Sequence, residues 1–338
     1  MPSAFCDIST RMKKATTHFI DAVLTQPRRT IKLVTGAALL ILLSACGGEK
    51  ADSDTIKIGV AIPNFDDTFN IYLKDAMDEY AKSKDNVSVV FVDAKEDTAR
   101  QLGQVENFIV QQMDAIIIMP VNTDATQPMT DRVMGKDIDL VYVNRRPAYL
   151  PEGVTYVGSD ELAFGETQAR FVADNIDGGN VGILMGMLTM EAALLRTQGA
   201  EDYLESLDNF NVTRKQTAMW QRTQAMTVME NWLHSSEPLD VVIANNDEMA
   251  LGAIQALEAA NKLDDILVVG IDATPDGVMS IERGALNATV FQDGAAQARG
   301  ALDAALNAIS KTQQDQITWI PAELVSQANV AAFKTSQK

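Results

Sequence analysis

Residues 241–253 read VVIANNDEMALGA, and residues 266–277 read ILVVGIDATPDG. Each stretch begins with the apolar residues of a buried strand, breaks at polar residues and continues into a segment with helical character. In an open α/β sheet, ligands bind beyond the carboxyl ends of the strands. We therefore expect Asn246 and Asp272, which follow these two strands, to lie where such a sheet binds a small polar molecule.

The same alternation of strand and helix extends outward over residues 55–325. The first part, from a strand predicted at 55–62 to a strand predicted at 139–143, reads as βαβαβαβ. A second series of similar length follows a short strand at 154–157, and the last predicted strand covers 317–325. Consecutive α/β units of this kind form parallel, doubly wound sheets. The sequence therefore predicts an α/β protein with two lobes, each a parallel sheet flanked by helices.

Charge and residue usage disfavour several classes of function. The 338 residues have a formal net charge of −18, whereas nucleic-acid binding needs a basic surface. His18 and His234 are the only histidines and Cys6 and Cys46 the only cysteines, which disfavours a metal site, thiol catalysis and a Ser-His-Asp triad. No Gly-x-Gly-x-x-Gly or Walker loop is present to cradle a nucleotide. We therefore expect no enzyme activity, cofactor, metal or nucleic-acid partner, and a surface position for His234 at a helix end.

The N-terminal segment predicts export and lipid attachment. Basic residues precede an apolar run at 33–43, which is too short for a comfortable membrane span and fits the core of a signal peptide. Small residues then lead directly into Cys46, which resembles a bacterial lipobox. We expect residues 1–45 to be a lipoprotein signal peptide, Cys46 to carry the lipid anchor, and residues 46–54 to be a flexible tether. A plain signal peptide with an incidental cysteine is the alternative.

Polar and aromatic residues gather at the carboxyl ends of the predicted strands, and one helix adds an arginine. These residues are Asp66, Asp67, Phe69, Asn144, Arg145, Arg196, Trp220, Asn245, Asn246, Asp272, Gln292 and Asp293. Carboxylates and amides exchange hydrogen bonds with vicinal hydroxyls, and an arginine fork bridges two adjacent oxygens. Aromatic faces pack against the C–H face of a ring. The set therefore predicts a binding site for a polyhydroxylated ring.

Several of these residues also have a purely structural interpretation. Asn246 or Asp247 could cap the helix that follows them, and Asp272 could cap the next helix. Trp220 could belong to the core, and Arg196 could be a solvated helix residue. Asp247 fits a capping role best. The shared position at strand ends and the complementary chemistry favour the binding interpretation for the set as a whole.

Residues 245–252 and 270–277 resemble the signature segments of the ribose/galactose-type periplasmic sugar-binding proteins, which are the solute receptors of ABC importers. The similarity extends from about Ile56 to about Val325. It implies the two-lobed type I periplasmic-binding-protein fold, in which the chain crosses between the lobes three times. The implied crossings lie near Gly158, Gln292 and Ile317. Lobe one would consist of residues 55–158 plus 293–316, and lobe two of residues 159–292 plus 317–330.

The resemblance also implies a set of ligand-binding residues and a class of ligand. The family positions correspond to Asp67, Phe69, Asn144, Arg145, Arg196, Trp220, Asn246, Asp272 and Gln292. Asn70, Met119 and Asn144 depart from the ribose pattern. The segments that look more like the inositol-binding branch are 66–69, 123–130, 142–147 and 229–233. We therefore expect myo-inositol or a close cyclitol, with ribose or another monosaccharide as the alternative.

By resemblance, the mature protein is a monomeric, lipid-anchored receptor in the bacterial periplasm. It would close on its ligand by a hinge motion and deliver it to the permease of an ABC importer. A co-receptor for a chemotaxis or signalling partner is an alternative that the sequence leaves open. A sugar-responsive transcription regulator would need a basic helix-turn-helix before residue 55, where the chain has an apolar signal core instead. An enzyme would need a nucleophile–base pair or a metal.

Overall fold

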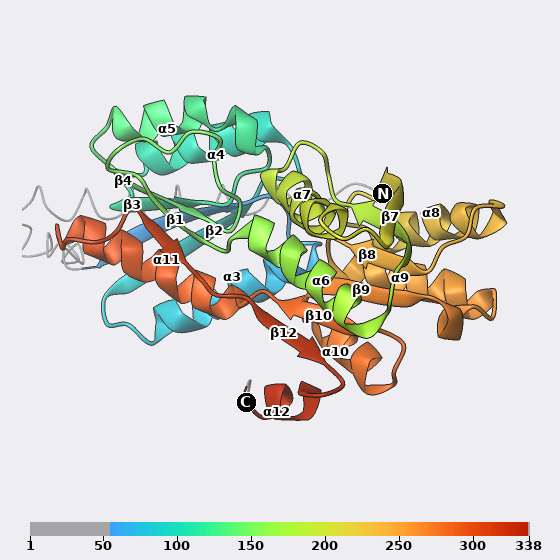
Figure 1. The fold of residues 1–338 in the computed structure, drawn as a ribbon. Coiled ribbons are helices and arrows are strands. Elements are labelled where there is room, and N and C mark those ends of the chain that lie inside the picture. Colours follow the sequence, from blue (N-terminus) through green and yellow to red (C-terminus); the bar gives the residue numbers. More distant parts are fainter. Residues whose placement is uncertain (1–54, 337–338) are drawn as a thin grey trace, which may run out of the picture. The chain divides into compact units, whose positions relative to one another are not determined.

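The computed structural model describes residues 55–336, so the expected signal peptide, the lipid anchor at Cys46 and the tether lie outside the described residues. The strands of residues 55–336 form two six-stranded sheets, with the orders β11-β5-β4-β3-β1-β2 and β12-β10-β9-β8-β6-β7. All strand pairs are parallel except β10 with β12. The expected two-lobed α/β fold is therefore confirmed (Figure 1).

The first lobe contains the N-terminal sheet and four main helices. Its strands are β1 (Ile56–Ile62), β2 (Val87–Asp93), β3 (Ala115–Ile118), β4 (Asp139–Val143), β5 (Thr155–Gly158) and β11 (Ile317–Trp319). Helices α4 (Thr98–Val110) and α5 (Gln127–Met134) cover one face, and α3 (Thr68–Lys82) and α11 (Gly294–Ile309) cover the other (Figure 1). A 3-10 helix, η1 (Thr123–Ala125), precedes α5. Strand β3 is apolar and buried along its whole length because helices cover both faces of this sheet.

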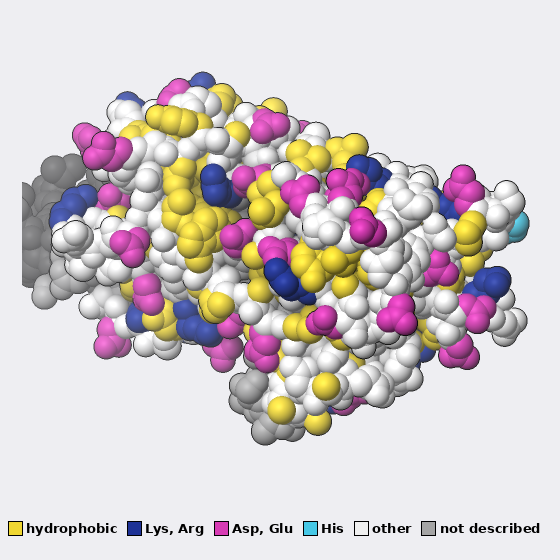
Figure 2. All heavy atoms as spheres, in the orientation of Figure 1, with side chains coloured by type: hydrophobic (Ala, Val, Ile, Leu, Met, Phe, Trp, Pro, Cys, Tyr) yellow, Lys and Arg dark blue, Asp and Glu magenta, His cyan; other side chains and the backbone are white. Residues whose placement is uncertain are grey.

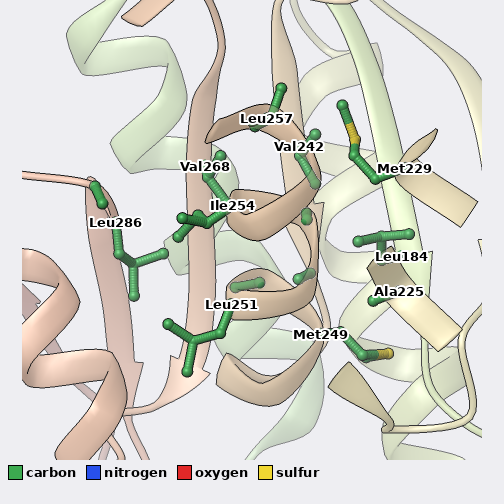
Figure 3. Close-up of a cluster of buried hydrophobic side chains, with 14 of the residues drawn as sticks. Leu184, Ala225, Met229, Val242, Met249, Leu251, Ile254, Leu257, Val268 and Leu286 are labelled. Atoms are coloured by element: carbon green, nitrogen blue, oxygen red, sulfur yellow. The ribbon is translucent and has the colours of Figure 1, made fainter. Parts of the chain in front are cut away.

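The second lobe repeats this plan. Its strands are β6 (Gly179–Met185), β7 (Phe210–Thr217), β8 (Val241–Ala244), β9 (Leu267–Asp272), β10 (Ala288–Phe291) and β12 (Glu323–Ser326). Its helices are α6 (Glu161–Asn175), α7 (Glu191–Glu205), α8 (Arg222–His234), α9 (Asp247–Ala259), α10 (Pro275–Glu282) and α12 (Val330–Ser336), with the 3-10 helix η2 (Leu263–Asp265). Helix α9 is the centre of the largest apolar cluster. Figure 3 shows Leu251, Ile254 and Leu257 of α9 beside Val242 and Val268 of the sheet.

Many helices begin with an aspartate or asparagine cap at the carboxyl end of a strand or soon after it. The side-chain oxygens of Asp67, Asp97, Asp160, Asn246 and Asp293 accept backbone N–H groups at the starts of α3, α4, α6, α9 and α11. Such caps satisfy N–H groups that have no partner within the helix. The polar residues that follow the strands therefore also fix where the helices start.

The chain passes between the lobes three times: between β5 and α6, between β10 and α11, and between β11 and β12. The third passage corrects the expected crossing near Ile317. The predicted strand 317–325 is two strands, because β11 pairs with β5 of the first sheet and β12 pairs with β10 of the second. Pro321 lies between them and has no N–H group for a sheet ladder. Residues 317–319 therefore belong to the first sheet.

The surface of the described residues carries both signs of charge. Acidic side chains are interleaved with Lys and Arg over the face shown in Figure 2, and they do not form one acidic patch there. His234 is exposed at the last position of α8, as predicted. No helix within residues 55–336 has the length and hydropathy that a membrane span requires.

Candidate functional site

All nine residues predicted to bind the ligand line one cavity between the two lobes. They are Asp67, Phe69, Asn144, Arg145, Arg196, Trp220, Asn246, Asp272 and Gln292. The cavity contains about 400 Å³ of empty space, part of it open to solvent. Asn70, Met190 and Ala192 also line it and were not among the predicted residues. The carboxyl ends of strands from both sheets therefore meet at this cavity, as the α/β architecture requires.

Asp67 and Phe69 enter the cavity from the start of α3. Asp67 caps this helix, and its Oδ1 accepts the backbone N–H of Asn70 at 2.9 Å. Its own N–H donates to Oδ1 of Asn64 at 2.7 Å, which fixes the approach of the chain to the helix. Within the described chain, the second carboxylate oxygen of Asp67 accepts no side-chain or backbone donor, so it can accept a hydrogen bond from a ligand.

Asn144 is held in a left-handed backbone conformation at the end of β4. Its φ is 63°, a region that asparagine tolerates better than most residues. The hydroxyl of Tyr156 donates to the carbonyl oxygen of Asn144 at 2.7 Å, and Nδ2 of Asn144 donates to Oε1 of Gln297 at 3.0 Å. A Cβ atom at Gly158 would lie 1.9 Å from the Tyr156 hydroxyl, so this position needs a glycine. These contacts leave Oδ1 of Asn144 as an acceptor for the cavity.

Arg145 has few protein partners for a buried cation. Its guanidinium donates through NH1 to the carbonyl oxygen of Pro120 at 3.1 Å. Burial lowers the pKa of Arg145, and the nearby charges of Glu96 and Asp67 partly oppose that shift. No ion pair involves Arg145 among residues 55–336. Most of its donors are therefore free to bridge adjacent ligand oxygens.

Arg196, by contrast, is held by the protein through one hydrogen bond from each of its three nitrogens. Its Nε pairs with Oε2 of Glu161 at 2.5 Å, and NH1 donates to the carbonyl oxygen of Asn245 at 2.7 Å. NH2 donates to Oε1 of Gln292 at 3.2 Å. Burial lowers the pKa of Arg196, but the charges of Glu161 and Asp272 outweigh it and the pKa is raised. The alternative of a solvated Arg196 is therefore wrong.

The arginine contact determines which way Gln292 presents its amide. Because Oε1 of Gln292 accepts from Arg196, its Nε2 is left as a donor in the cavity wall. This nitrogen is buried and has no hydrogen-bond partner in the part of the chain that the structure describes. A buried amide donor without a partner is costly, so the site offers a ligand acceptor a clear gain. Glu161, which pairs with Arg196, is the first residue of α6 and follows closely after the end of β5 at Gly158, but it was not among the predicted residues.

The capping roles expected for two neighbouring residues are reversed. Asn246 is the helix cap, with Oδ1 accepting the N–H of Met249 at 3.0 Å. Asp247, which fitted the cap best by sequence, is instead the first residue of α9 and is fully buried. Its carboxylate accepts from Thr274 and Thr289, and its burial raises the pKa to about 7 despite these hydrogen bonds. Thr274, not Asp272, caps the following helix.

Three of the nine cavity residues have strained backbones. The φ angles of Asn144, Trp220 and Asp272 are 63°, 65° and 118°. Non-glycine residues with positive φ cost roughly 1–3 kcal/mol each and cluster at ligand clamps and active sites. Burial raises the pKa of Asp272 well above its usual range; Arg196 opposes this shift, and the charge of Asp247 adds to it.

Trp220 is half-buried beside the cavity and not fully in the core. Its Nε1 donates to the sulfur of Met190 at 3.1 Å, which orients the ring. A Cβ atom at Gly186 would lie 2.1 Å from this ring, so a glycine is needed beneath it. The guanidinium of Arg196 lies 5.7 Å from the ring centroid. One aromatic face is therefore held in place at the wall of the cavity.

Comparison with known proteins agrees with this architecture. A family model described as "Periplasmic binding protein domain" matches residues 58–313. A Rhizobium meliloti protein whose name refers to rhizopine binding is 41% identical over 310 residues, covering 90% of this chain and 98% of that protein. The ribose import binding protein RbsB of Bacillus subtilis is 33% identical over 263 residues, covering 75% and 84%.

A similar solved structure comes from Bacillus halodurans. It is an ABC transporter solute binding protein with bound myo-inositol, and it is 39% identical to this chain. The superposition has a TM-score of 0.81 and covers 84% of this chain and 99% of that one. The similarity therefore spans both lobes and the crossings between them.

Proposed function

The chain belongs to the periplasmic binding protein domain family, and from that premise we propose that it is the solute receptor of an ABC importer for a cyclic polyol, myo-inositol in particular. The observation that carries this proposal is the convergence of nine polar, cationic and aromatic residues from both lobes on one cavity. The 39% identity to a solute-binding protein with bound myo-inositol supports this ligand. The 33% identity to a ribose import protein keeps ribose as the second candidate.

The cavity chemistry suits a ring that carries hydroxyls around its whole edge. Asp67 and Asp272 supply acceptors, while Arg145 and Gln292 supply donors. Each ring hydroxyl can donate once and accept, so donors and acceptors from opposite walls are used together. The ring of Trp220 can pack against the C–H face. An analogue lacking one hydroxyl would leave a buried polar group unpaired, which gives the site its specificity.

Binding would be coupled to closure of the two lobes. Three described hydrogen bonds that span the cleft are long. They are 3.4 Å from Thr68 Oγ1 to Glu248 Oε1, 3.4 Å from Thr123 Oγ1 to the carbonyl oxygen of Thr189, and 3.3 Å from the N–H of Glu191 to Thr123 Oγ1. Bonds of this length contribute little. A ligand that touches both lobes therefore supplies most of the free-energy difference between the closed and open forms. The closed form would dock on the permease, and opening there would release the ligand.

The location that we propose depends on residues outside the described range. We propose cleavage after Ala45, a lipid on Cys46 and a tether at 46–54, which hold a monomeric receptor in the periplasm. Mass spectrometry of the mature protein checks this part. A mass that includes a diacylglycerol on a Cys46 N-terminus is expected, and an unmodified cysteine there would contradict the anchor.

Calorimetry with a panel of sugars tests the ligand. The panel is myo-inositol, scyllo-inositol, ribose, galactose, glucose and xylose at equal concentrations. We expect myo-inositol to bind most tightly, and Asp272→Ala to weaken it by a few kcal/mol at most. If ribose bound most tightly, the proposed ligand would change from myo-inositol to ribose, and the proposed receptor function would stand. Absence of binding by every member would contradict the proposed class of ligand.

A further inference from the structure

The turn after β9 has an unfavourable backbone and no glycine to relieve it. Asp272 and Ala273 have φ angles of 118° and 52° in succession. Positive φ is strained for residues that carry a Cβ, and such a turn persists only where its surroundings hold it. This turn carries the carboxylate of Asp272 into the cavity. Whatever holds the turn therefore also sets where that carboxylate lies.

Asp247 ties down the two backbone N–H groups that follow Asp272. Its Oδ2 accepts the N–H and the hydroxyl of Thr274 at 2.8 and 3.2 Å. Its Oδ1 accepts the hydroxyl of Thr289 at 2.7 Å, and the same hydroxyl oxygen accepts the N–H of Ala273 at 3.2 Å. One carboxylate thus links the start of α9, the strained turn and strand β10.

Two glycines make room for the carboxylate of Asp247. A Cβ atom at Gly270 would lie 2.3 Å from Oδ1, and one at Gly277 would lie 2.2 Å from Oδ2. Both glycines are therefore required by the carboxylate, and both belong to the stretch at 270–277. Asp247 itself does not line the cavity. Its hydrogen bonds reach the cavity through the neighbouring turn, which carries Asp272.

From these contacts we propose that Asp247, acting through Thr274 and Thr289, is a positioning residue that fixes the carboxylate of Asp272 for the ligand. The inference rests on the proposed receptor function, and it adds a residue that determines affinity and specificity without touching the ligand. A hydrogen bond to a preset carboxylate costs no reorganisation on binding, which is why a held turn favours affinity. The alternative is that Asp247 stabilises the second lobe and has no effect on ligand binding.

The substitution Thr289→Val separates the two interpretations because it keeps the shape of the side chain and removes the hydroxyl. Thr130→Val is the matched control: this buried hydroxyl also makes two hydrogen bonds, to the carbonyl of Thr126 and to the hydroxyl of Tyr142, and it lies away from the cavity. Both variants should lose similar stability. Only Thr289→Val should weaken myo-inositol binding, by about tenfold, because one net hydrogen bond is lost from the turn. Thr289→Ser, which keeps the hydroxyl, should bind myo-inositol with an affinity close to that of the wild-type protein.

A double-mutant cycle tests whether the effect passes through the cavity carboxylate. In an Asp272→Ala background, Thr289→Val should change affinity by less than about twofold, since nothing remains to be positioned. An undiminished tenfold loss in that background would overturn the proposal.

Amide hydrogen exchange without ligand gives an independent readout. Exchange at residues 272–274 should rise in Thr289→Val and stay unchanged in Thr130→Val. Unchanged exchange in Thr289→Val would overturn the proposal. If the wild-type protein binds none of the panel, the proposed class of ligand fails, and this exchange measurement still decides whether the Thr289 hydroxyl holds the turn.

Discussion

The two buried arginines of the cavity have different tasks, and this difference is testable at single residues. Arg196 makes three described hydrogen bonds to the protein, one of them to the carboxylate of Glu161, whereas Arg145 has one described carbonyl partner. We expect Arg145→Ala to weaken myo-inositol binding by about 10- to 100-fold with little loss of stability, because hydrogen bonds to charged groups contribute about 1.5–3 kcal/mol. Calorimetry and urea denaturation measure the two effects. A stability loss without an affinity loss would contradict this role.

Arg196→Met should instead lower the stability of the protein more than its affinity for myo-inositol. It keeps most of the side-chain volume but leaves Glu161 as a buried charge without its ion-pair partner. Removing one partner of a buried pair costs about 3–5 kcal/mol. We therefore expect a large drop in the free energy of unfolding, measured by urea denaturation. Arg170→Met, which breaks an exposed ion pair with Glu166, is the control and should cost little.

The buried carboxyl of Asp247 predicts a pH dependence of stability. Its pKa in the folded protein is raised from 3.8 to about 7, mainly by burial, and the charge of Glu248 contributes in the same direction. A raised pKa means that folding favours the protonated form, so the contribution of this group to stability is greatest below about pH 4 and declines as the pH rises to about 7. The substitution Asp247→Asn removes the titrating group and with it this dependence.

The measurement compares urea denaturation of the wild-type protein and Asp247→Asn at several values between about pH 4.5 and pH 8, a range that spans the expected decline. The stability of the wild-type protein relative to the variant should fall as the pH rises through this range, and then level off. Because Asp272 shares the neighbourhood and also has a raised pKa, the difference between the two proteins is the relevant quantity. If the wild-type protein instead gained stability relative to Asp247→Asn as the pH rises, the raised pKa of Asp247 would be contradicted.

At the residue scale, the sequence predicted which side chains meet but not all of their roles. Strand ends of a parallel sheet share one edge, which indicated most of the cavity residues. Arg196 was added from a helix, and the choice of these nine followed from the family resemblance. Met190 and Ala192 were missed because apolar and small residues give no polar signal. The roles of Asn246 and Asp247 were reversed because capping depends on which side chain reaches the helix N–H groups, and burial of Asp247 depends on threonines from two distant segments.

Among the elements, the hinge strand β5 links backbone geometry to the site. A Cβ atom at Gly158 would collide with the Tyr156 hydroxyl, which donates to the carbonyl of Asn144. We expect Gly158→Ala to cost about 1–3 kcal/mol by overpacking and to weaken myo-inositol binding, because Tyr156 must move. Gly103→Ala within α4 is the control, with no atom within 4 Å of the new Cβ. It should be neutral or stabilising by up to about 1 kcal/mol.

Urea denaturation and calorimetry on the two glycine variants provide the check. Equal behaviour of the two variants would contradict the role given to Gly158.

The sequence predicted most strands and helices because their apolar periodicities are clear, yet it merged β11 and β12 into one strand. The two strands are separated by a short segment with Pro321, and only pairing with β5 or β10 reveals that they belong to different sheets.

For the whole molecule, the two sheets have separate apolar cores, so each lobe can move as a body about the three chain passages. One of the described hydrogen bonds across the cleft, from Thr68 to Glu248, is long at 3.4 Å. If the ligand, and not this contact, drives closure, Thr68→Val should change the affinity for myo-inositol by less than about twofold. Asp272→Ala should weaken it by more than about tenfold, because it removes an acceptor from the second lobe.

Small-angle scattering reports the closure itself. The radius of gyration should fall on saturation with myo-inositol in both the wild-type protein and Thr68→Val, since both keep the cavity residues of the two lobes. The same fall should require much higher ligand concentrations in Asp272→Ala, because a ligand shifts an equilibrium only by its difference in affinity for the two states. A radius that stays constant in the wild-type protein while calorimetry shows binding would contradict ligand-driven closure. A compact form without ligand in Asp272→Ala would indicate that protein contacts alone close the cleft.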